Sequence, residues 1–178
     1  MKTLVLVFHP NITESRGNRH LLQEIEKYSD VTIHDVYASY PDGKIDVELE
    51  QQLVENHDRI IFQFPFYWYS APALLKKWLE EVIAHGWAFG TNGDKMKDKE
   101  FLPAVTTGVD EEGYTPDGLV KFNVSELLRP LEATTHFVGA YYLAPFTVHG
   151  VGHQSDEELS QKAQEYVDYA LSPELIAV

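Results

Sequence analysis

Three short, mostly apolar runs constrain the fold of this chain more than any other feature of its sequence. They are Thr3 to Phe8, Arg59 to Phe64 and Phe101 to Thr107. Runs of this kind are typical of strands buried on both faces, as strands are in parallel sheets. Stretches with helical spacing of apolar residues separate them. We therefore expect an α/β protein whose parallel sheet is covered by helices on both faces.

Weaker patterns complete the set of expected elements. Two further strands are predicted at Val31 to Tyr37 and Thr134 to Leu143. Helices are predicted at Asn18 to Tyr28, Asp46 to Asn56, Ala71 to Ala84, Val120 to Leu131 and Asp156 to Leu171. Five parallel strands with right-handed crossovers fit the order 2-1-3-4-5, which brings the loops after Phe8, Phe64 and Thr107 to one edge. No linker or repeat divides the chain, so residues 1–178 are expected to form a single domain.

Charge and cysteine content exclude several classes of function. The net charge of −14 disfavours nonspecific binding to nucleic acid or to an anionic membrane surface. The absence of cysteine excludes disulfides, thiolate metal sites and cysteine nucleophiles, and it suits a reducing cytoplasm. The apolar run from Leu4 to Phe8 is too short for a signal peptide, and nothing approaches a membrane-spanning length. Because the net negative charge repels anions, an anionic ligand would have to be held by hydrogen-bond donors close to it.

The loop after the first strand offers such donors. It runs from His9 to Asn18 and opens a predicted helix, whose N-terminal N–H groups and dipole favour an anion. Ser15 and Asn18 add side-chain donors, Arg16 adds positive charge and Gly17 is the only glycine in the segment. It is neither a dinucleotide fingerprint nor a Walker loop. The segment alone does not decide between a phosphate site and an ordinary capped loop.

An aromatic segment follows the third strand. Residues 62–68 contain five aromatic side chains, and Tyr69 comes next. Ligands of open α/β sheets bind at the carboxyl ends of the strands, where this segment is expected to lie. It therefore predicts a planar aromatic cofactor. A hydrophobic plug or a subunit interface is the alternative, and interface use does not exclude cofactor use.

Two further loops carry candidate residues. Thr106, Thr107 and Gly108 end the fourth strand and could hydrogen-bond a planar ring, although a simple turn is the alternative. The segment from His149 to His153 places two histidines four residues apart in a glycine-rich loop. Asp156 is the one further ligand nearby, and the loop is not helical, so we expect no metal site.

The segment from Gln63 to Trp78 also carries a family resemblance. It matches the pattern Q-x-P-x-x-W-[FY]-x-x-P-x-x-[LM]-K-x-W of the flavodoxin-fold NAD(P)H:quinone oxidoreductases. The likeness covers the chain from Thr3 to about Leu143. It is closest to the bacterial quinone reductases that accompany glutathione-gated potassium efflux, through Trp68-Tyr69-Ser70, His85-Gly86-Trp87-Ala88 and Ala104-Val105-Thr106-Thr107-Gly108.

This resemblance implies roles for individual residues. His9 and the segment Ser15, Arg16, Gly17 and Asn18 match a flavin phosphate loop. Phe66, Tyr67, Trp68 and Tyr69 match the segment that packs on the isoalloxazine, and Thr106, Thr107 and Gly108 match a second ring-contacting loop. Tyr114 matches a tyrosine that assists hydride transfer. The histidine that accompanies this tyrosine in the mammalian enzymes is missing, because the equivalent position lies near Val120, and Val109 replaces the second of two glycines.

The implied activity is NAD(P)H oxidation coupled to two-electron reduction of small quinones in a ping-pong cycle. FMN is favoured over FAD because the chain is short. A homodimer is implied, with Phe89 where a partner's aromatic closes the site and with the helix from Ala71 to Trp87 at the interface. Two alternatives stay open: a flavin-binding regulatory subunit of a potassium efflux transporter, and a single-electron carrier of the flavodoxin type.

Overall fold

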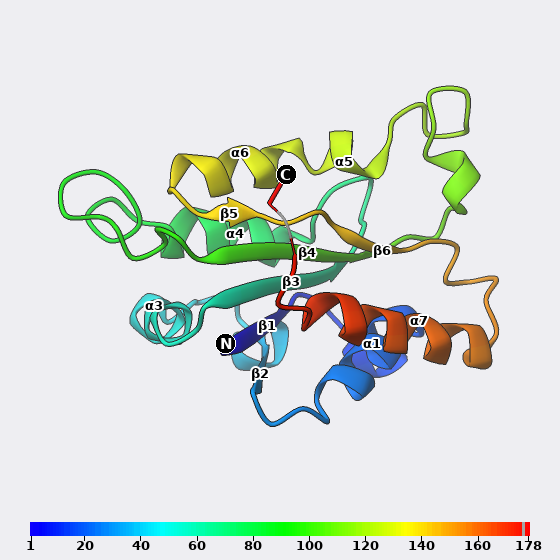
Figure 1. The fold of residues 1–178 in the computed structure, drawn as a ribbon, viewed down its shortest axis with the longest axis horizontal. Helices are drawn as coiled ribbons and strands as arrows, with labels where there is room; N and C mark the ends of the chain where they lie inside the picture. The colour runs from blue at the N-terminus through cyan, green and yellow to red at the C-terminus, as the bar shows by residue number, and fades with distance from the viewer. Residues whose placement is uncertain (176) are drawn as a thin grey trace.

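The computed structural model describes residues 1–175 and 177–178. Its centre is a parallel sheet with the order β2-β1-β3-β4-β5, and β6 pairs with β4 beyond the end of β5 (Figure 1). The strands are β1 (Thr3–Val7), β2 (Val31–Asp35), β3 (Arg59–Pro65), β4 (Glu100–Thr106), β5 (Tyr141–Tyr142) and β6 (Phe146–Val148). The predicted α/β class and strand order are confirmed.

Helices cover both faces of the sheet (Figure 1). They are α1 (Gly17–Ile25), α2 (Val36–Ser39), α3 (Val47–Glu55), α4 (Ala73–Val82), α5 (Val124–Leu127), α6 (Arg129–Phe137) and α7 (Asp156–Ala170), with short 3₁₀ helices η1 (Ile12–Glu14) and η2 (Glu111–Gly113). Helices α1 and α7 pack on one face, whereas α3, α4 and α6 build the core on the other.

The two central strands are buried along their whole length, as their apolar sequences predict. Every residue of β1 and β3 is buried. Val7 pairs with Gln63, and Pro65 pairs with Thr106. The carboxyl ends of β1, β3 and β4 therefore meet at one edge, where the loops that follow them come together.

Side chains fix the helices at their ends and on their buried faces. A capping box begins α7: Ser155 Oγ accepts from Glu158 N at 3.2 Å, and Ser155 N donates to Glu158 Oε2 at 2.7 Å. In α3, the fully buried Glu50 carboxylate accepts from Tyr40 and Trp78 and bonds the His34 imidazole. Burial alone would raise the pKa of Glu50, but these hydrogen bonds outweigh it and hold the pKa below its ordinary value.

The predicted fifth strand, Thr134 to Leu143, is wrong over its first part. Residues 134–137 are the last turn of α6, the strand β5 covers Tyr141–Tyr142 alone, and β6 follows beyond the predicted range. Pro130 lies in the first turn of α6, a position that proline tolerates, so it begins this helix instead of ending the predicted one. The hydroxyls of Thr134 and Thr135 donate to Pro130 O and Leu131 O, which satisfies them within the helix.

The helix after the aromatic segment starts later than predicted. It begins at Ala73 with Pro72 as N-cap, and no side chain caps it. Ser70 does not cap this helix, because it pairs with Tyr67 across a tight turn. The predicted strand from Val31 to Tyr37 ends two residues earlier than predicted, at Asp35, which caps the one-turn helix α2.

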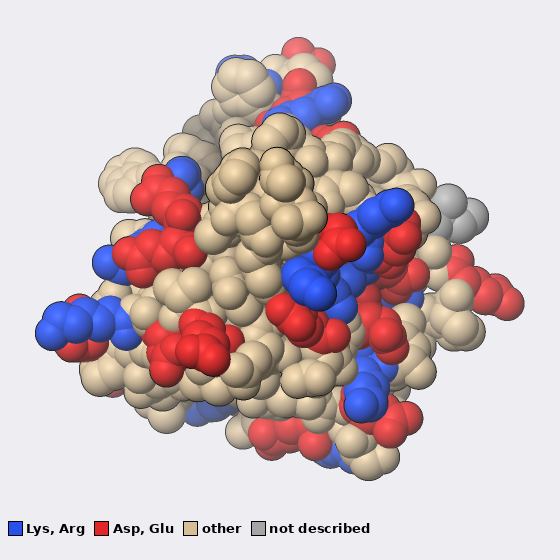
Figure 2. Space-filling model, turned by 90° about the vertical axis from the view of Figure 1, so that its left-hand side faces the viewer, with Lys and Arg blue, Asp and Glu red and all other residues tan. Residues whose placement is uncertain are grey.

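The end of the molecule opposite to these converging loops carries charges of both signs. Figure 2 shows acidic and basic side chains interspersed on this face, around a patch without charged residues. Within the part of the chain that the structure describes, no helix is long and apolar enough to cross a membrane.

Candidate active site

The start of α1 lies at the carboxyl edge of the sheet, against β4 and the loop after β6. Gly17 makes this approach possible, since a Cβ there would lie 2.8 Å from Val151 Cγ1 and 3.2 Å from Thr106 Cγ2. Ser15 Oγ accepts a hydrogen bond from Asn18 N at 3.2 Å. The first N–H groups of a helix have no partner inside it, so this end is suited to an anion.

Asn18 joins three elements beneath this loop. It is completely buried, and its Nδ2 donates to Thr106 Oγ1 at 2.7 Å. Its backbone oxygen accepts from Gln63 Nε2 at 2.9 Å. Its Oδ1 finds no hydrogen-bond partner among the described residues. A buried polar atom without a partner is costly in a protein interior, so this position suits contact with a polar group of a ligand.

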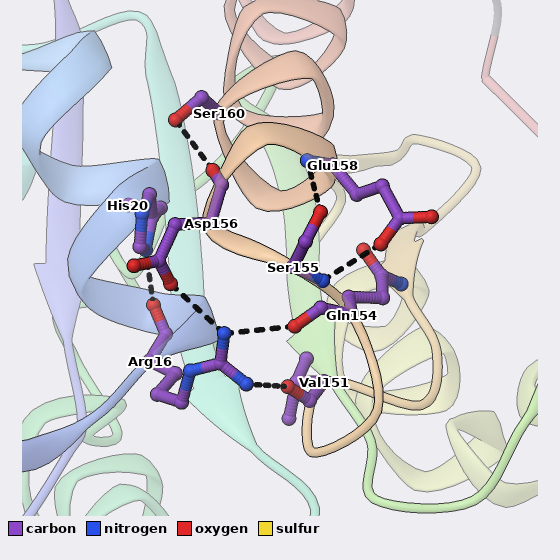
Figure 3. A network of polar contacts seen from close by, with 8 residues as sticks. All are labelled: Arg16, His20, Val151, Gln154, Ser155, Asp156, Glu158 and Ser160. Carbon is purple, nitrogen blue, oxygen red and sulfur yellow. Dashed lines mark hydrogen bonds and ion pairs between the residues drawn. The ribbon is translucent and has the colours of Figure 1, made fainter.

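His9 and Arg16, two predicted members of the site, have other partners in the structure. His9 Nδ1 accepts from Asn11 N at 3.0 Å, and burial lowers the pKa of His9. The Arg16 guanidinium turns toward the loop after β6 (Figure 3). It donates to Val151 O at 3.3 Å and to Gln154 O and Asp156 Oδ1 at 2.8 Å each. A phosphate contact by Arg16 therefore stays a prediction.

The aromatic segment forms a strained, exposed turn. Tyr67 and Ser70 exchange backbone hydrogen bonds of 2.9 and 3.2 Å, while Trp68 and Tyr69 between them have φ angles of 50° and 61°. Two successive left-handed residues are typical of a type I′ turn, which normally carries Asn or Gly. Bulky residues pay a conformational cost there that is usually found at functional sites. The Trp68 side chain is 91% exposed, so packing inside this chain does not compensate the strain.

The loop after β4 lies beside this turn. Phe66 N donates to Thr106 O at 2.9 Å. A Cβ at Gly108 would meet no protein atom within 4 Å, so space is open above this residue. Tyr114 is buried, with its ring centroid 6.2 Å from that of Phe66. Burial raises the pKa of Tyr114, and the phenol is neutral at physiological pH.

The structure thus brings the three predicted loops together: the start of α1, the aromatic turn and the segment from Thr106 to Gly108. Their donors, flat aromatic side chains and open space above Gly108 fit a flat, anionic nucleotide such as a flavin. Sequence reasoning missed a fourth participant, the loop from His149 to Ser155, which was considered only as a metal site. Its place after the last strand at the same edge is the signal that could have identified it.

An apolar groove lies next to the aromatic turn. Its volume is about 450 Å³, and it runs from Ser70 and Ala71 between α4 and α5–α6. Leu75, Leu79, Phe89, Leu131 and Phe137 are among the side chains that line it. Trp78 on α4 does not line this groove, because it is fully buried in the core against Phe8 and Phe62.

Comparison with known proteins places this architecture in a family. The chain belongs to the family with the flavodoxin-like fold, whose profile matches residues 1–170. It is 46% identical to the Uncharacterized NAD(P)H oxidoreductase YrkL of Bacillus subtilis, over 95% of this chain and 97% of the relative. It is 41% identical to the glutathione-regulated potassium-efflux system ancillary protein KefG of Pectobacterium carotovorum, over 97% and 94% of the two chains.

Solved structures share the whole fold. General stress protein 14 of Treponema denticola, in complex with FMN, superposes with a TM-score of 0.92 at 40% identity, over 96% of this chain and 98% of that one. An NADPH-quinone reductase from P. pentosaceus gives 0.89 at 34% identity, over 97% and 99%. A structure described as a thermophilic tryptophan halogenase from Streptomycin violaceusniger gives 0.93 at 47% identity, over 95% and 98%, so the names of similar structures are not uniform. The predicted family is confirmed, and the oxidoreductase names and the FMN complex agree with the predicted class and cofactor.

Proposed function

We propose that this protein is an FMN-dependent NAD(P)H oxidoreductase that reduces small quinones by two electrons. The observation that carries the proposal is the convergence of three loops, with a strained aromatic turn, at the carboxyl edge of the sheet. Relatives named NAD(P)H oxidoreductase and NADPH-quinone reductase, and a structure in complex with FMN, support it.

Different residues of the site would bind the phosphate and the ring system of the flavin. Backbone N–H groups at the start of α1 and the Ser15 hydroxyl would bind its phosphate, and Asn18 would hold this loop against β3 and β4. The aromatic turn and the segment from Thr106 to Gly108 would hold the ring system. The bound flavin supplies the hydride chemistry, which no protein side chain provides. The chain contributes position, an apolar wall that excludes water and a neutral phenol, Tyr114, that can donate a hydrogen bond.

One pocket serves both substrates in this proposal. The nicotinamide of NAD(P)H and the quinone would occupy in turn the space beside Tyr67, Trp68 and Tyr114. The two substrates therefore exclude each other, and the reaction follows a ping-pong scheme. FMN is preferred to FAD because a similar solved structure, general stress protein 14 of Treponema denticola, is a complex with FMN.

Steady-state kinetics test the shared pocket. NADPH and a benzoquinone are varied together with the FMN-loaded protein. We expect parallel double-reciprocal lines. Intersecting lines would reject a shared pocket, although flavin-dependent turnover itself would still support the oxidoreductase class.

A second candidate function is regulation of a membrane transporter. The similarity to the potassium-efflux ancillary protein KefG favours it. In that case the protein binds a flavin nucleotide and regulates the transporter, and its oxidoreductase activity is secondary. FMN-loaded protein that reduces no quinone, yet binds membranes containing the potassium efflux transporter and not membranes without it, would favour the regulatory function over the enzymatic one.

A further inference from the structure

His149 contacts two residues of the proposed flavin site, although it follows a different strand. It comes directly after β6, and its ring centroid lies 5.3 Å from that of Tyr114 with the planes tilted by 46°. Its Nδ1 lies 3.2 Å from Thr107 Oγ1. The side chain is half-buried. One imidazole therefore contacts both the Tyr114 ring and the Thr107 hydroxyl.

Backbone hydrogen bonds hold His149 in this place from both sides. Thr107 N donates to Val148 O at 2.9 Å, and Val151 N donates to Thr107 O at 3.1 Å. Gly150 N donates to Val109 O at 3.1 Å. Gly150 has a φ of +60°, a left-handed conformation that glycine adopts without strain.

Arg16 fixes the far side of the same loop. Its guanidinium bonds the carbonyl oxygens of Val151 and Gln154 and the Asp156 carboxylate (Figure 3). Gln154 Nε2 in turn donates to His149 O at 2.6 Å. The loop is thus tied to the start of α1 on one side and to the loop after β4 on the other, which leaves the imidazole little freedom.

The hydrogen bonds also determine which nitrogen of His149 carries a proton. The Thr107 hydroxyl has one proton, and it donates this proton to Val109 O at 2.8 Å. Thr107 Oγ1 can therefore only accept from His149, so Nδ1 is the protonated nitrogen. Burial lowers the pKa of His149 and so favours the neutral ring. The nearby carboxylates of Glu111, Glu112 and Asp110 oppose this shift without reversing it.

We propose that His149 is a positioning residue for this site: it sets the orientation of Tyr114 and of the Thr107 hydroxyl that would face the flavin. This inference rests on the proposed function. Its ring supports one face of the phenol, and its Nδ1–H holds the threonine hydroxyl in a single orientation. A site without this support would hold the flavin less firmly, even with every residue that contacts the flavin unchanged.

The rate at which FMN dissociates from the loaded full chain tests the proposal without reference to turnover. Recovery of free FMN fluorescence follows this rate. We expect His149→Ala to release FMN about three to ten times faster than the wild type, as the loss of one hydrogen bond predicts. His149→Asn keeps a donor near the Nδ1 position and should restore most of the difference. His136→Gln is the control, because His136 lies on α6 outside this loop and its side chain is 53% exposed, and it should release FMN at the wild-type rate.

A double-mutant cycle separates positioning from general loosening of the loop. In a Tyr114→Leu background the ring contact is already lost, so adding His149→Ala should accelerate release less than it does in the wild type. An equal acceleration in both backgrounds, or a wild-type rate in His149→Ala, would overturn the proposal. If His149→Ala does not fold, His149→Leu, which fills the space without a donor, replaces it. A wild-type chain that retains no FMN would instead contradict the proposed function itself.

Discussion

At the scale of single residues, Asn18 serves both the fold and the candidate site. Its position in the loop could be predicted, because it opens a helix after a buried strand. Its partner could not, since Thr106 lies 88 residues further along the chain and meets it only across the sheet edge. Arg16 shows the same limit: its charge suggested a phosphate contact, whereas the structure gives it partners in a loop that the sequence did not connect with it.

Replacing Ser15 and Asn18 together with Ala should weaken FMN binding. Each lost charge-assisted hydrogen bond costs about 1.5–3 kcal/mol of binding free energy. Fluorescence titration with FMN measures this loss. Asp46→Ala is the matched control, because it removes the N-cap bond of α3 to Leu49 N away from the site. We expect the control to lose stability but not FMN affinity, and equal affinities of the double variant and the wild type would contradict the placement of the phosphate.

The half-buried histidines His9 and His149 predict a pH dependence of stability. Burial lowers the pKa of both in the folded chain, below the ordinary value of 6.5. The unfolded chain therefore binds more protons as the pH falls below that value. Their contribution to stability is fully present above pH 6.5 and is lost as the pH falls through the lower folded-state pKa values.

Urea unfolding across this pH range measures the effect. The free energy of unfolding should decrease below neutrality, and His149→Gln should reduce the slope. A wild-type slope in His149→Gln would show that burial of this imidazole does not contribute.

At the scale of elements, the predicted bounds were accurate where the local sequence alone determines the structure of a segment. The first four strands were predicted within two residues of their ends, because β1 and β3 are buried throughout and their apolar runs are unambiguous. The fifth was not, because Thr134 and Thr135 have high strand propensity but are helical in the structure. Tertiary packing and the position of Pro130 overrode that propensity.

We expect the strain in the aromatic turn to lower the free energy of unfolding while the turn supports the bound flavin. Trp68→Gly removes an exposed side chain and the strain of a left-handed tryptophan, so we expect the free energy of unfolding to rise by about 1 kcal/mol. FMN should dissociate faster, because the ring loses part of its support. Asn92→Gly is the matched control at another left-handed position, which asparagine tolerates, and it should change neither quantity. Destabilisation of Trp68→Gly with unchanged FMN release would contradict a functional origin of the strain.

At the scale of the whole molecule, the groove between α4 and α6 is the surface that would form the predicted homodimer. Apolar side chains line it, and Phe137 at its rim is 69% exposed. Apolar surfaces of this kind mark contacts in soluble proteins.

Two further expectations stay predictions. They are that residues 1–178 form one domain and that the protein is cytoplasmic.

Light scattering at micromolar concentration should therefore give twice the chain mass of 20.3 kDa. Leu79→Glu places a charge in the groove and should give a monomer. Leu49→Glu is the matched control on the exposed surface of α3 and should remain a dimer. A wild-type monomer, or a Leu79→Glu dimer, would exclude the groove as the dimer interface.

Anaerobic titration of the FMN-loaded protein tests the central claim most directly. The visible absorbance of the bound flavin is recorded while NADPH and then a benzoquinone are added. We predict that one equivalent of NADPH bleaches the flavin and that one equivalent of the quinone restores its absorbance. Bound FMN that neither NADPH nor NADH bleaches would contradict an NAD(P)H oxidoreductase built on this site.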